Sequence, residues 1–335
     1  MDVSVLMCIY REPTEYVRKA IESILTQTYR NYEFIIVIDD PECKRLIELV
    51  EQYKGEDERI IIIRNPTNMG LTKSLNIGLQ NCKGEYIVRM DADDISLPHR
   101  IEKQVYYMKS HPSINASGTY AYVIDENDSV IGKKKTPVNI EEASTQCLFC
   151  TPLIHPASII RRVVNGKPIQ YDEKLRYSQD FGLWSSLPFG TISNIPEYHL
   201  RYRETSSQIS TKNRDAQMAC AKRVQKGNLD RLGIVLEDND ARCYEALING
   251  DTSIQLSQSE IIAFQETMLE SIAEYGNARA MYKYIVRCYV WLLYKKNVQF
   301  WRCLRDLLVY FYKTKGVSVE SVILTSKLYV KNCER

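Results

Sequence analysis

The chain has 335 residues, of which 44% are hydrophobic and 26% are charged. This composition excludes a disordered chain and is typical of a globular protein with one large domain and an appendage, or with two domains. The formal net charge is only +2, but residues 279–335 contain twelve Lys and Arg against three acidic residues. We therefore expect an acidic body followed by a basic tail, and an acidic body argues against a nucleic-acid partner.

The ten cysteines are scattered along the chain. No secretory-type leader precedes Val3 and no apolar run reaches about 18 residues, which predicts a reducing, cytoplasmic setting with the cysteines as small buried side chains. Cys147 and Cys150 do have the spacing of metal ligands, and His155 follows them. A zinc site is the less favoured interpretation because no second pair of ligands answers the first.

The first ninety residues alternate short apolar runs with amphipathic stretches. Strands are expected at residues 3–9, 34–38, 59–64 and from 86 onward, with helices between them. This alternation predicts an α/β fold, with a parallel sheet covered by helices on both faces. The elements expected further on are a helix at 99–110, strands and a hairpin at 115–131, a helix at 140–150, a strand at 157–161 and a helix starting near Asp180.

Polar residues follow the predicted strands, and ligands of such sheets bind beyond the carboxyl ends of the strands. No glycine-rich dinucleotide fingerprint and no Walker-type loop occurs at a junction between strand and helix, so NAD-dependent and ATP-hydrolysing enzymes lose support. A tyrosine beside a separate carboxylate can stack on a base and accept its N–H. The segments that the sheet would bring to this edge are Tyr10–Glu12, Asp39–Asp40, Arg64–Gly70 and Asp91–Asp94.

Asp91, Asp93 and Asp94 come directly after an apolar strand. Because a buried strand does not tolerate unpaired charge, we expect all three at an exposed strand end, facing a cation. Carboxylate oxygens suit Mg²⁺ or Mn²⁺, which bind through one or two protein carboxylates and the phosphates of a substrate. The alternative is an Asp-rich turn that ends the strand and caps the next helix.

Six blocks of the chain, in their order, resemble the bacterial family 2 glycosyltransferases with the GT-A fold. The resemblance covers about residues 1–210 and implies a catalytic domain at 1–212, followed by a helical region at 213–335. It also implies inverting transfer of a sugar from a nucleotide-sugar donor, in our reading UDP-linked. The blocks are Ser4–Tyr10, Ala20–Tyr29, Phe34–Asp40, Asn68–Asn76, Gly84–Asp94 and Gln179–Trp184.

The resemblance assigns roles to single residues. It implies that Asp91 lies near the ribose, that Asp93 binds the Mn²⁺ or Mg²⁺ ion, and that Asp180 is the general base, although Asp180 also suits a simple helix cap. His155 is expected as an acceptor contact, a second metal ligand or a structural histidine. The donor is expected to contact Tyr10, Glu12, Asp39, Asp40, Asn68, Gly70, Lys73, Arg89, Asp91 and Ala92.

The tail from residue 215 predicts amphipathic helices, and residues 281–312 place many aromatic residues among basic ones. Such a helix suits an anionic membrane surface, or the aromatic residues form the core of a helical bundle. We expect a lipid-diphosphate-linked or oligosaccharide acceptor in the synthesis of a bacterial surface polysaccharide such as O-antigen or capsule, at the inner face of the cytoplasmic membrane. The alternatives are a sugar-nucleotide transferase and an inactive scaffold that binds nucleotide sugars.

Overall fold

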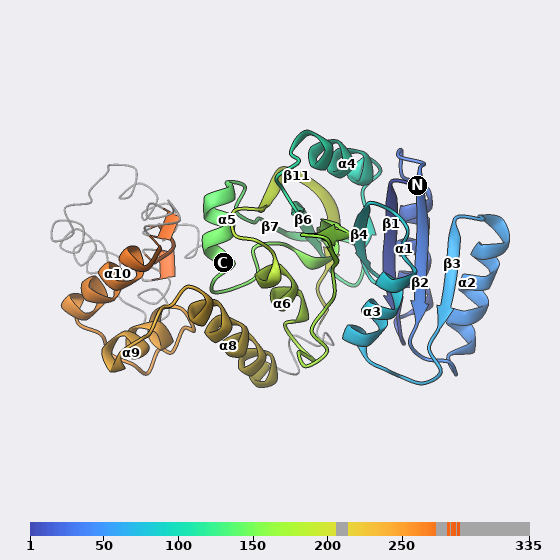
Figure 1. Ribbon diagram of the computed structural model, residues 1–335. Helices are drawn as coiled ribbons and strands as arrows, with labels where there is room; N and C mark the ends of the chain where they lie inside the picture. The colour runs from blue at the N-terminus through green and yellow to red at the C-terminus, as the bar shows by residue number, and fades with distance from the viewer. Residues whose placement is uncertain (206–213, 273–279, 282, 286, 289–335) are drawn as a thin grey trace. The chain divides into compact units, whose positions relative to one another are not determined.

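The computed structural model describes residues 1–205, 214–272, 280–281, 283–285 and 287–288 (Figure 1). The chain divides into two compact units, Met1–Gln225 and Lys226–Arg335. The boundary lies inside helix α8 (Arg214–Arg231), a little beyond the boundary expected from the sequence. The first unit carries the sheet and all the predicted site residues.

One half of the sheet is parallel, and its inner strands are buried. Its strands lie in the order β3-β2-β1-β4, and β1 pairs with both β2 and β4. Every residue of β1 and β2 is buried, as the continuous apolar runs predict for strands covered on both faces. The strands are β1 (Val3–Ile9), β2 (Tyr32–Ile38), β3 (Ile60–Arg64) and β4 (Tyr86–Asp91).

Helices cover both faces of this half, and the alternation of β1 shows which side each helix takes. Val5 and Met7 belong to the core that α1 (Thr14–Leu25) and α2 (Lys44–Glu56) complete. Leu6 belongs to the opposite core, which includes the buried residues of α3 (Leu71–Asn81). Helix α3 packs closely on the sheet, since a Cβ on Gly78 would come within 2.3 Å of the Leu6 Cδ1.

The other half of the sheet is mixed, and the described strands continue from β4 in the order β8-β6-β11-β5. Strand β8 runs antiparallel to both β4 and β6, β11 runs parallel to β6, and β7 completes a hairpin with β6. The parallel strands β1, β4, β6 and β11 therefore end at the same edge. The strands are β5 (Ile95–Ser96), β6 (Ala116–Ile124), β7 (Val130–Lys134), β8 (Ile159–Arg161) and β11 (Ile192–Arg203).

The connections in this half contain short helices and one small ribbon. The helix expected to run to residue 150 ends earlier, at Gln146, while the others begin close to their expected positions. The elements are α4 (Arg100–Ser110), α5 (Ile140–Gln146), the 3₁₀ turn η1 (His155–Ala157), α6 (Gln179–Ser186), and the ribbon of β9 (Val163–Val164) and β10 (Lys167–Pro168).

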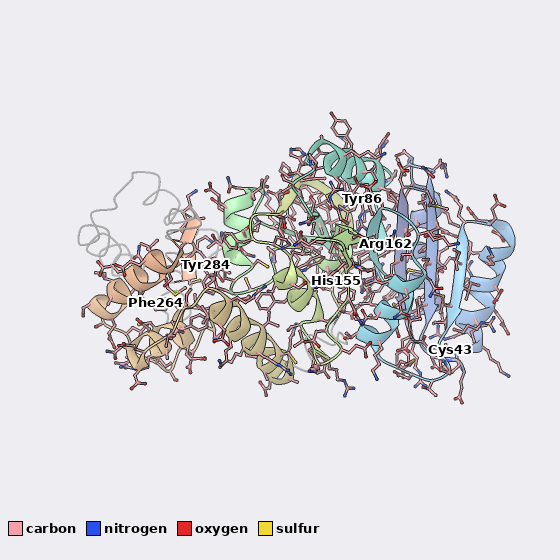
Figure 2. All side chains as sticks on the ribbon, viewed as in Figure 1. Cys43, Tyr86, His155, Arg162, Phe264 and Tyr284 are labelled. Atoms are coloured by element: carbon pink, nitrogen blue, oxygen red, sulfur yellow. The ribbon has the colours of Figure 1, made fainter. Side chains whose placement is uncertain are left out.

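The described part of the second unit is helical, with α9 (Asp238–Leu247) and α10 (Gln258–Ile272) packed together. Tyr244 meets the edge of Phe264 at 6.5 Å between ring centroids (Figure 2). None of the helices in the described residues is both long and apolar enough to cross a membrane. The basic, aromatic stretch 281–312 lies almost wholly outside the described residues, so both interpretations of it remain predictions.

Candidate active site

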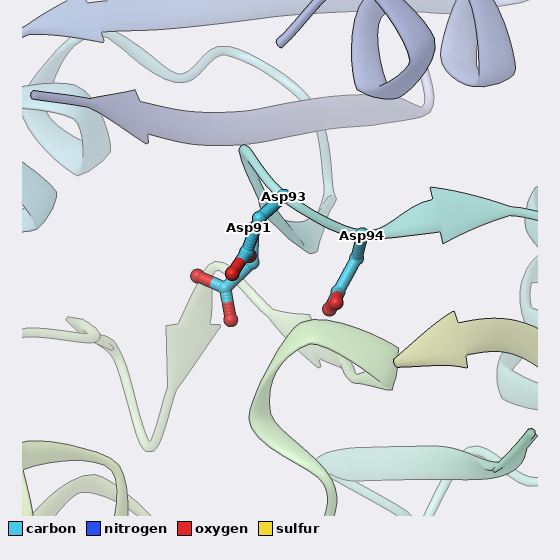
Figure 3. Close-up of side chains that lie close together, drawn as sticks. All are labelled: Asp91, Asp93 and Asp94. Atoms are coloured by element: carbon cyan, nitrogen blue, oxygen red, sulfur yellow. The ribbon is translucent and has the colours of Figure 1, made fainter. Parts of the chain in front are cut away.

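The carboxylates that end β4 come together at the carboxyl edge of the sheet (Figure 3). Asp91, Asp93 and Asp94 each offer an oxygen, and these oxygens all lie within 4.8 Å of one another. In the described part of the chain, no other set of three or more His, Cys, Asp or Glu side chains is grouped in this way. The strand places them there because its apolar residues are buried up to Met90, and the carboxylates begin at Asp91, where the strand ends.

Three acidic groups at this loop, Asp93, Asp94 and Glu12, have raised pKa values. Burial, and then the negative charges of Asp91 and Glu12, raise the pKa of Asp93 to about 7. Burial also raises the pKa of Glu12 and raises that of Asp94 well above its ordinary value. Clustered carboxylates with raised pKa values are what a divalent cation would relieve, and an all-oxygen donor set fits Mg²⁺ or Mn²⁺.

Asp94 does not lie where the sequence placed it. The expectation of three exposed carboxylates is wrong for this residue, which is 1% exposed. Its Oδ1 accepts a hydrogen bond from the backbone N–H of Arg203 at 2.8 Å, while its Oδ2 is buried without a hydrogen-bond partner. Arg100 is buried as well, and burial lowers its pKa to about 9 against the opposing effect of the Asp94 charge. Asp94 therefore faces the protein interior more than its two neighbours do.

Arg89 is the cation at the centre of the site. It lies on β4 and is 3% exposed, and its guanidinium forms an ion pair with Asp91. Its Nε is buried, and no atom in the described part of the chain accepts a hydrogen bond from it. A buried guanidinium with a free donor can bind an anion such as a phosphate oxygen.

Asp180 is the second residue of α6 and is half-buried. The helix begins after Ser178, which adopts a left-handed backbone conformation with φ 54°. Burial raises the pKa of Asp180, while the positive charge of Arg89 lowers it and the negative charge of Asp91 raises it further. Asp180 therefore shares an electrostatic environment with the residues at the end of β4, although it is about ninety positions away in the sequence.

His155, labelled in Figure 2, contacts two aromatic rings, those of Tyr171 and Trp184. Its Nε2 and the Tyr171 hydroxyl are 2.8 Å apart, and its ring meets the edge of Trp184 at 6.0 Å. Burial and the charge of Arg89 lower the pKa of His155 well below its ordinary value, so the ring is neutral. His155 is not part of the group formed by Asp91, Asp93 and Asp94. Among the described residues, His155 also does not form a metal-ligating group with Cys147 and Cys150.

Asp39 and Asp40, which were expected to contact the donor, hold the protein's own loops. Asp39 accepts hydrogen bonds from Asn65 Nδ2 at 2.7 Å, from the Met69 N–H at 2.8 Å and from the Gly70 N–H at 2.9 Å. Gly70 has φ +83°, a conformation that favours glycine. Asp39 thus fixes the loop that leads into α3.

Asp40 pairs with the Arg11 Nε at 2.7 Å, and this hydrogen bond lowers the pKa of Asp40. Arg11 also lies 5.0 Å from the centre of the Tyr10 ring, and the Glu12 carboxylate accepts from the Tyr10 N–H at 2.8 Å. The remaining predicted contacts are Asn68 and Lys73, which are exposed, and Ala92, which is buried.

Sequence reasoning missed the residues that hold the site together. Asn76 donates to the Tyr171 carbonyl at 3.0 Å and accepts from the Tyr171 N–H at 2.9 Å, so it ties the segment before α6 to α3. Phe181 packs with Leu175 and Val224, which fixes the start of α6. No local pattern could reveal the pairs of Asn76 with Tyr171 and of Phe181 with Val224, since their members lie far apart in the sequence.

The fold is that of the GT-A class of α/β proteins, as comparisons with known proteins show. The structure of TarS residues 1–349 from S. aureus in complex with UDP-GlcNAc matches with a TM-score of 0.56 at 14% identity, covering 99% of this chain and 92% of that one. At this identity the likeness concerns the fold alone.

The family follows from sequence. Residues 4–167 match the model of the glycosyl transferase family 2. An uncharacterized glycosyltransferase of Methanocaldococcus jannaschii is 37% identical over 60% of this chain and 70% of its own length. The O-antigen biosynthesis glycosyltransferase WbnJ of Escherichia coli is 32% identical over 60% of this chain and 79% of its own length. The chain belongs to glycosyltransferase family 2, as the six sequence blocks predicted.

Proposed function

We propose that this glycosyltransferase is metal-dependent and inverting, with a nucleoside-diphosphate sugar as donor, Asp93 as metal ligand and Asp180 as general base. The observation that carries the proposal is the shared environment of two separate acidic groups. The end of β4 carries three carboxylates, of which Arg89 forms an ion pair with Asp91, and Asp180 on α6 experiences the charges of the same Arg89 and Asp91.

The two acidic groups suit two different tasks. A divalent cation bound at Asp93 would supply Lewis-acid stabilisation to the diphosphate that leaves the sugar. Arg89 adds a fixed positive charge beside Asp91, where a phosphate oxygen can accept from its free Nε–H. Asp180 accepts the proton of the acceptor hydroxyl as the new glycosidic bond forms, and the burial that raises its pKa makes it a stronger base.

The donor base belongs at the loops that Asp39 and Asp40 organise. Tyr10 offers a ring for stacking, and Asp39 already orders the loop from Asn65 to Gly70. We favour a UDP-linked sugar because a neighbour in fold was solved with UDP-GlcNAc. We favour a lipid-diphosphate-linked or oligosaccharide acceptor of a bacterial surface polysaccharide, because one relative is named for O-antigen biosynthesis.

The test is a panel of nucleotide sugars, with and without Mn²⁺ or Mg²⁺, scored for release of the nucleoside diphosphate. The Asp180→Asn variant should lose about 10²- to 10⁴-fold in turnover while it still binds UDP, because only the base is removed. Asp172→Asn is the matched control, since Asp172 is exposed and precedes the same helix. Unchanged turnover in Asp180→Asn would refute the assignment of the base, and a scaffold protein would show no turnover in any variant.

A further inference from the structure

Arg203 is the last residue of β11, and its side chain is fully buried. Arg203 donates two hydrogen bonds to the loop Asp91–Asp94, which we call the carboxylate loop. Its backbone N–H donates to the Asp94 Oδ1 at 2.8 Å, and its Nε donates to the Asp93 carbonyl oxygen at 2.7 Å. A single residue, more than a hundred positions further along the chain, thus holds the backbone of the predicted metal ligand and the side chain of its neighbour.

The other end of the guanidinium is fixed by elements outside the loop. Nη1 donates to the Asp125 carbonyl oxygen at 2.7 Å, and Nη2 forms an ion pair with Asp128 in the turn between β6 and β7. Asp128 also pairs with Lys19 of α1 at 2.7 Å, and the guanidinium carbon lies 4.1 Å from the centre of the Tyr16 ring. The guanidinium group of Arg203 is therefore fixed by contacts outside the carboxylate loop as well as by its bond to the loop.

This arrangement matters because the carboxylates of the loop repel one another. Oxygens of Asp91, Asp93 and Asp94 all lie within 4.8 Å of one another, so the loop gains by spreading these side chains apart when no cation is present. If a cation must order the loop when it binds, the free energy spent on ordering lowers the affinity for the cation. A loop already held in place avoids that loss.

We propose that Arg203 is a positioning residue that presets the Asp93–Asp94 turn for a divalent cation, through the Asp125–Asp128 turn of the β6–β7 hairpin. The inference rests on the proposed metal role of Asp93. It assigns Arg203 no contact with donor or acceptor. A lysine at this position keeps the charge but cannot reproduce a fork that binds two carbonyls and a carboxylate together.

Arg161 provides a matched control at the opposite end of β4. Its Nε donates to the Ile114 carbonyl at 3.0 Å, its Nη1 to Glu85 at 3.0 Å and its Nη2 to the Met108 carbonyl at 3.1 Å. Arg203 and Arg161 thus make the same kinds of bonds, and only Arg203 makes them to the carboxylate loop. Arg203→Lys and Arg161→Lys should cost similar amounts of thermal stability.

The experiment measures Mn²⁺ binding directly by electron paramagnetic resonance, in the presence of saturating UDP. Loss of supporting contacts around a metal ligand typically weakens affinity about 10- to 100-fold, and we expect a loss in this range for Arg203→Lys against less than about twofold for Arg161→Lys. Asp128→Asn should weaken Mn²⁺ binding in the same direction by a smaller factor. Asp57→Asn, which alters a carboxylate paired with Arg59 elsewhere, should leave it unchanged.

Equal Mn²⁺ affinity in Arg203→Lys and the unaltered protein would overturn this inference and leave the proposed function standing. Equal losses in Arg203→Lys and Arg161→Lys would also overturn it, because both would then act only through general stability. Failure of the unaltered protein to bind Mn²⁺ would overturn this inference together with the proposed metal role of Asp93.

Discussion

The two ends of strand β4 differ in how their charges are satisfied. At its start, Arg161 binds Glu85, the Tyr86 hydroxyl and two backbone carbonyls (Figure 2 labels Tyr86). At its end, carboxylates with raised pKa values crowd together, and donors and acceptors such as the Nε of Arg89 remain buried without partners. Among the described residues, the first end pairs its charges internally, whereas the second has carboxylates and a donor that a ligand could satisfy. Burial alone therefore does not separate the two kinds of polar residue.

Of the substitutions considered, Asp93→Asn at the carboxyl end of β4 should have the largest effect on turnover. Turnover should fall at least about 100-fold, because the variant loses the carboxylate assigned to the cation that stabilises the leaving diphosphate. The metal-free protein should become more stable by about 1 kcal/mol, since a buried and unbalanced charge is removed. Nucleoside diphosphate release and thermal unfolding in EDTA measure the two effects. Reduced stability in EDTA would contradict the description of this end as unbalanced.

Arg161→Ala makes the opposite change at the structural end. The loss of its hydrogen bonds should cost about 1–3 kcal/mol of unfolding free energy, with UDP affinity in Mn²⁺ within about twofold of the unaltered protein. Denaturant unfolding and calorimetric titration provide the two numbers. A loss of UDP affinity as large as that of Asp93→Asn would show that the two ends are not independent.

The carboxyl end of β4 should also make the unfolding free energy of the metal-free protein depend on pH. Because the folded protein raises the pKa of Asp93 from 3.8 to about 7, it binds more protons than the unfolded chain between these values. Stability from this group is thus full below pH 3.8 and is lost as pH rises through 7. We expect the unfolding free energy in EDTA to be about 1 kcal/mol higher at pH 6 than at pH 8, and Asp93→Asn to remove that contribution. A pH response unchanged by this substitution would be inconsistent with the raised pKa.

Lys73→Ala should have the smallest effect. Lys73 is exposed in the first turn of α3, where its charge opposes the helix dipole, so its loss should leave stability unchanged or slightly raised. If Lys73 contacts the donor phosphates, the donor KM should rise about threefold while kcat stays within about twofold. Lys83→Ala, at an exposed position beyond the same helix, is the control. An unchanged KM would remove Lys73 from the donor site.

The sequence predicted the elements that depend on local pattern. The apolar runs at β1, β2 and β4 and the carboxylates that follow them could be recognised because burial and charge alternate within a few residues. The burial of Asp94 could not, since its partner is the backbone of Arg203 across the sheet. The early end of α5 at Gln146 was also missed, because residues 147–149 are buried by tertiary packing and continue the apolar pattern. The regular helix gives way there to a tighter turn, in which the N–H groups of Leu148 and Phe149 donate to carbonyls three residues back.

The same distinction applies to site residues. Asp91, Asp93 and Asp180 were predicted as site residues from their motifs; the structure groups Asp91 with Asp93, and Asp180 experiences the charges of Arg89 and Asp91. Their chemical roles stay predictions. The internal hydrogen bonds of Asp39 and the neutral state of His155 depend on loops and charges from other parts of the chain. Motifs therefore indicate which side chains carry chemistry, while their supporting contacts require the fold.

Calorimetric titration of UDP into the unaltered protein, once in Mn²⁺ and once in EDTA, is the direct test of a cation site at the end of β4. If the end of β4 is arranged for a cation that the donor diphosphate shares, UDP should bind at least about tenfold more tightly in Mn²⁺. Equal UDP affinity in Mn²⁺ and in EDTA would mean that no cation at the end of β4 contributes to binding of the diphosphate.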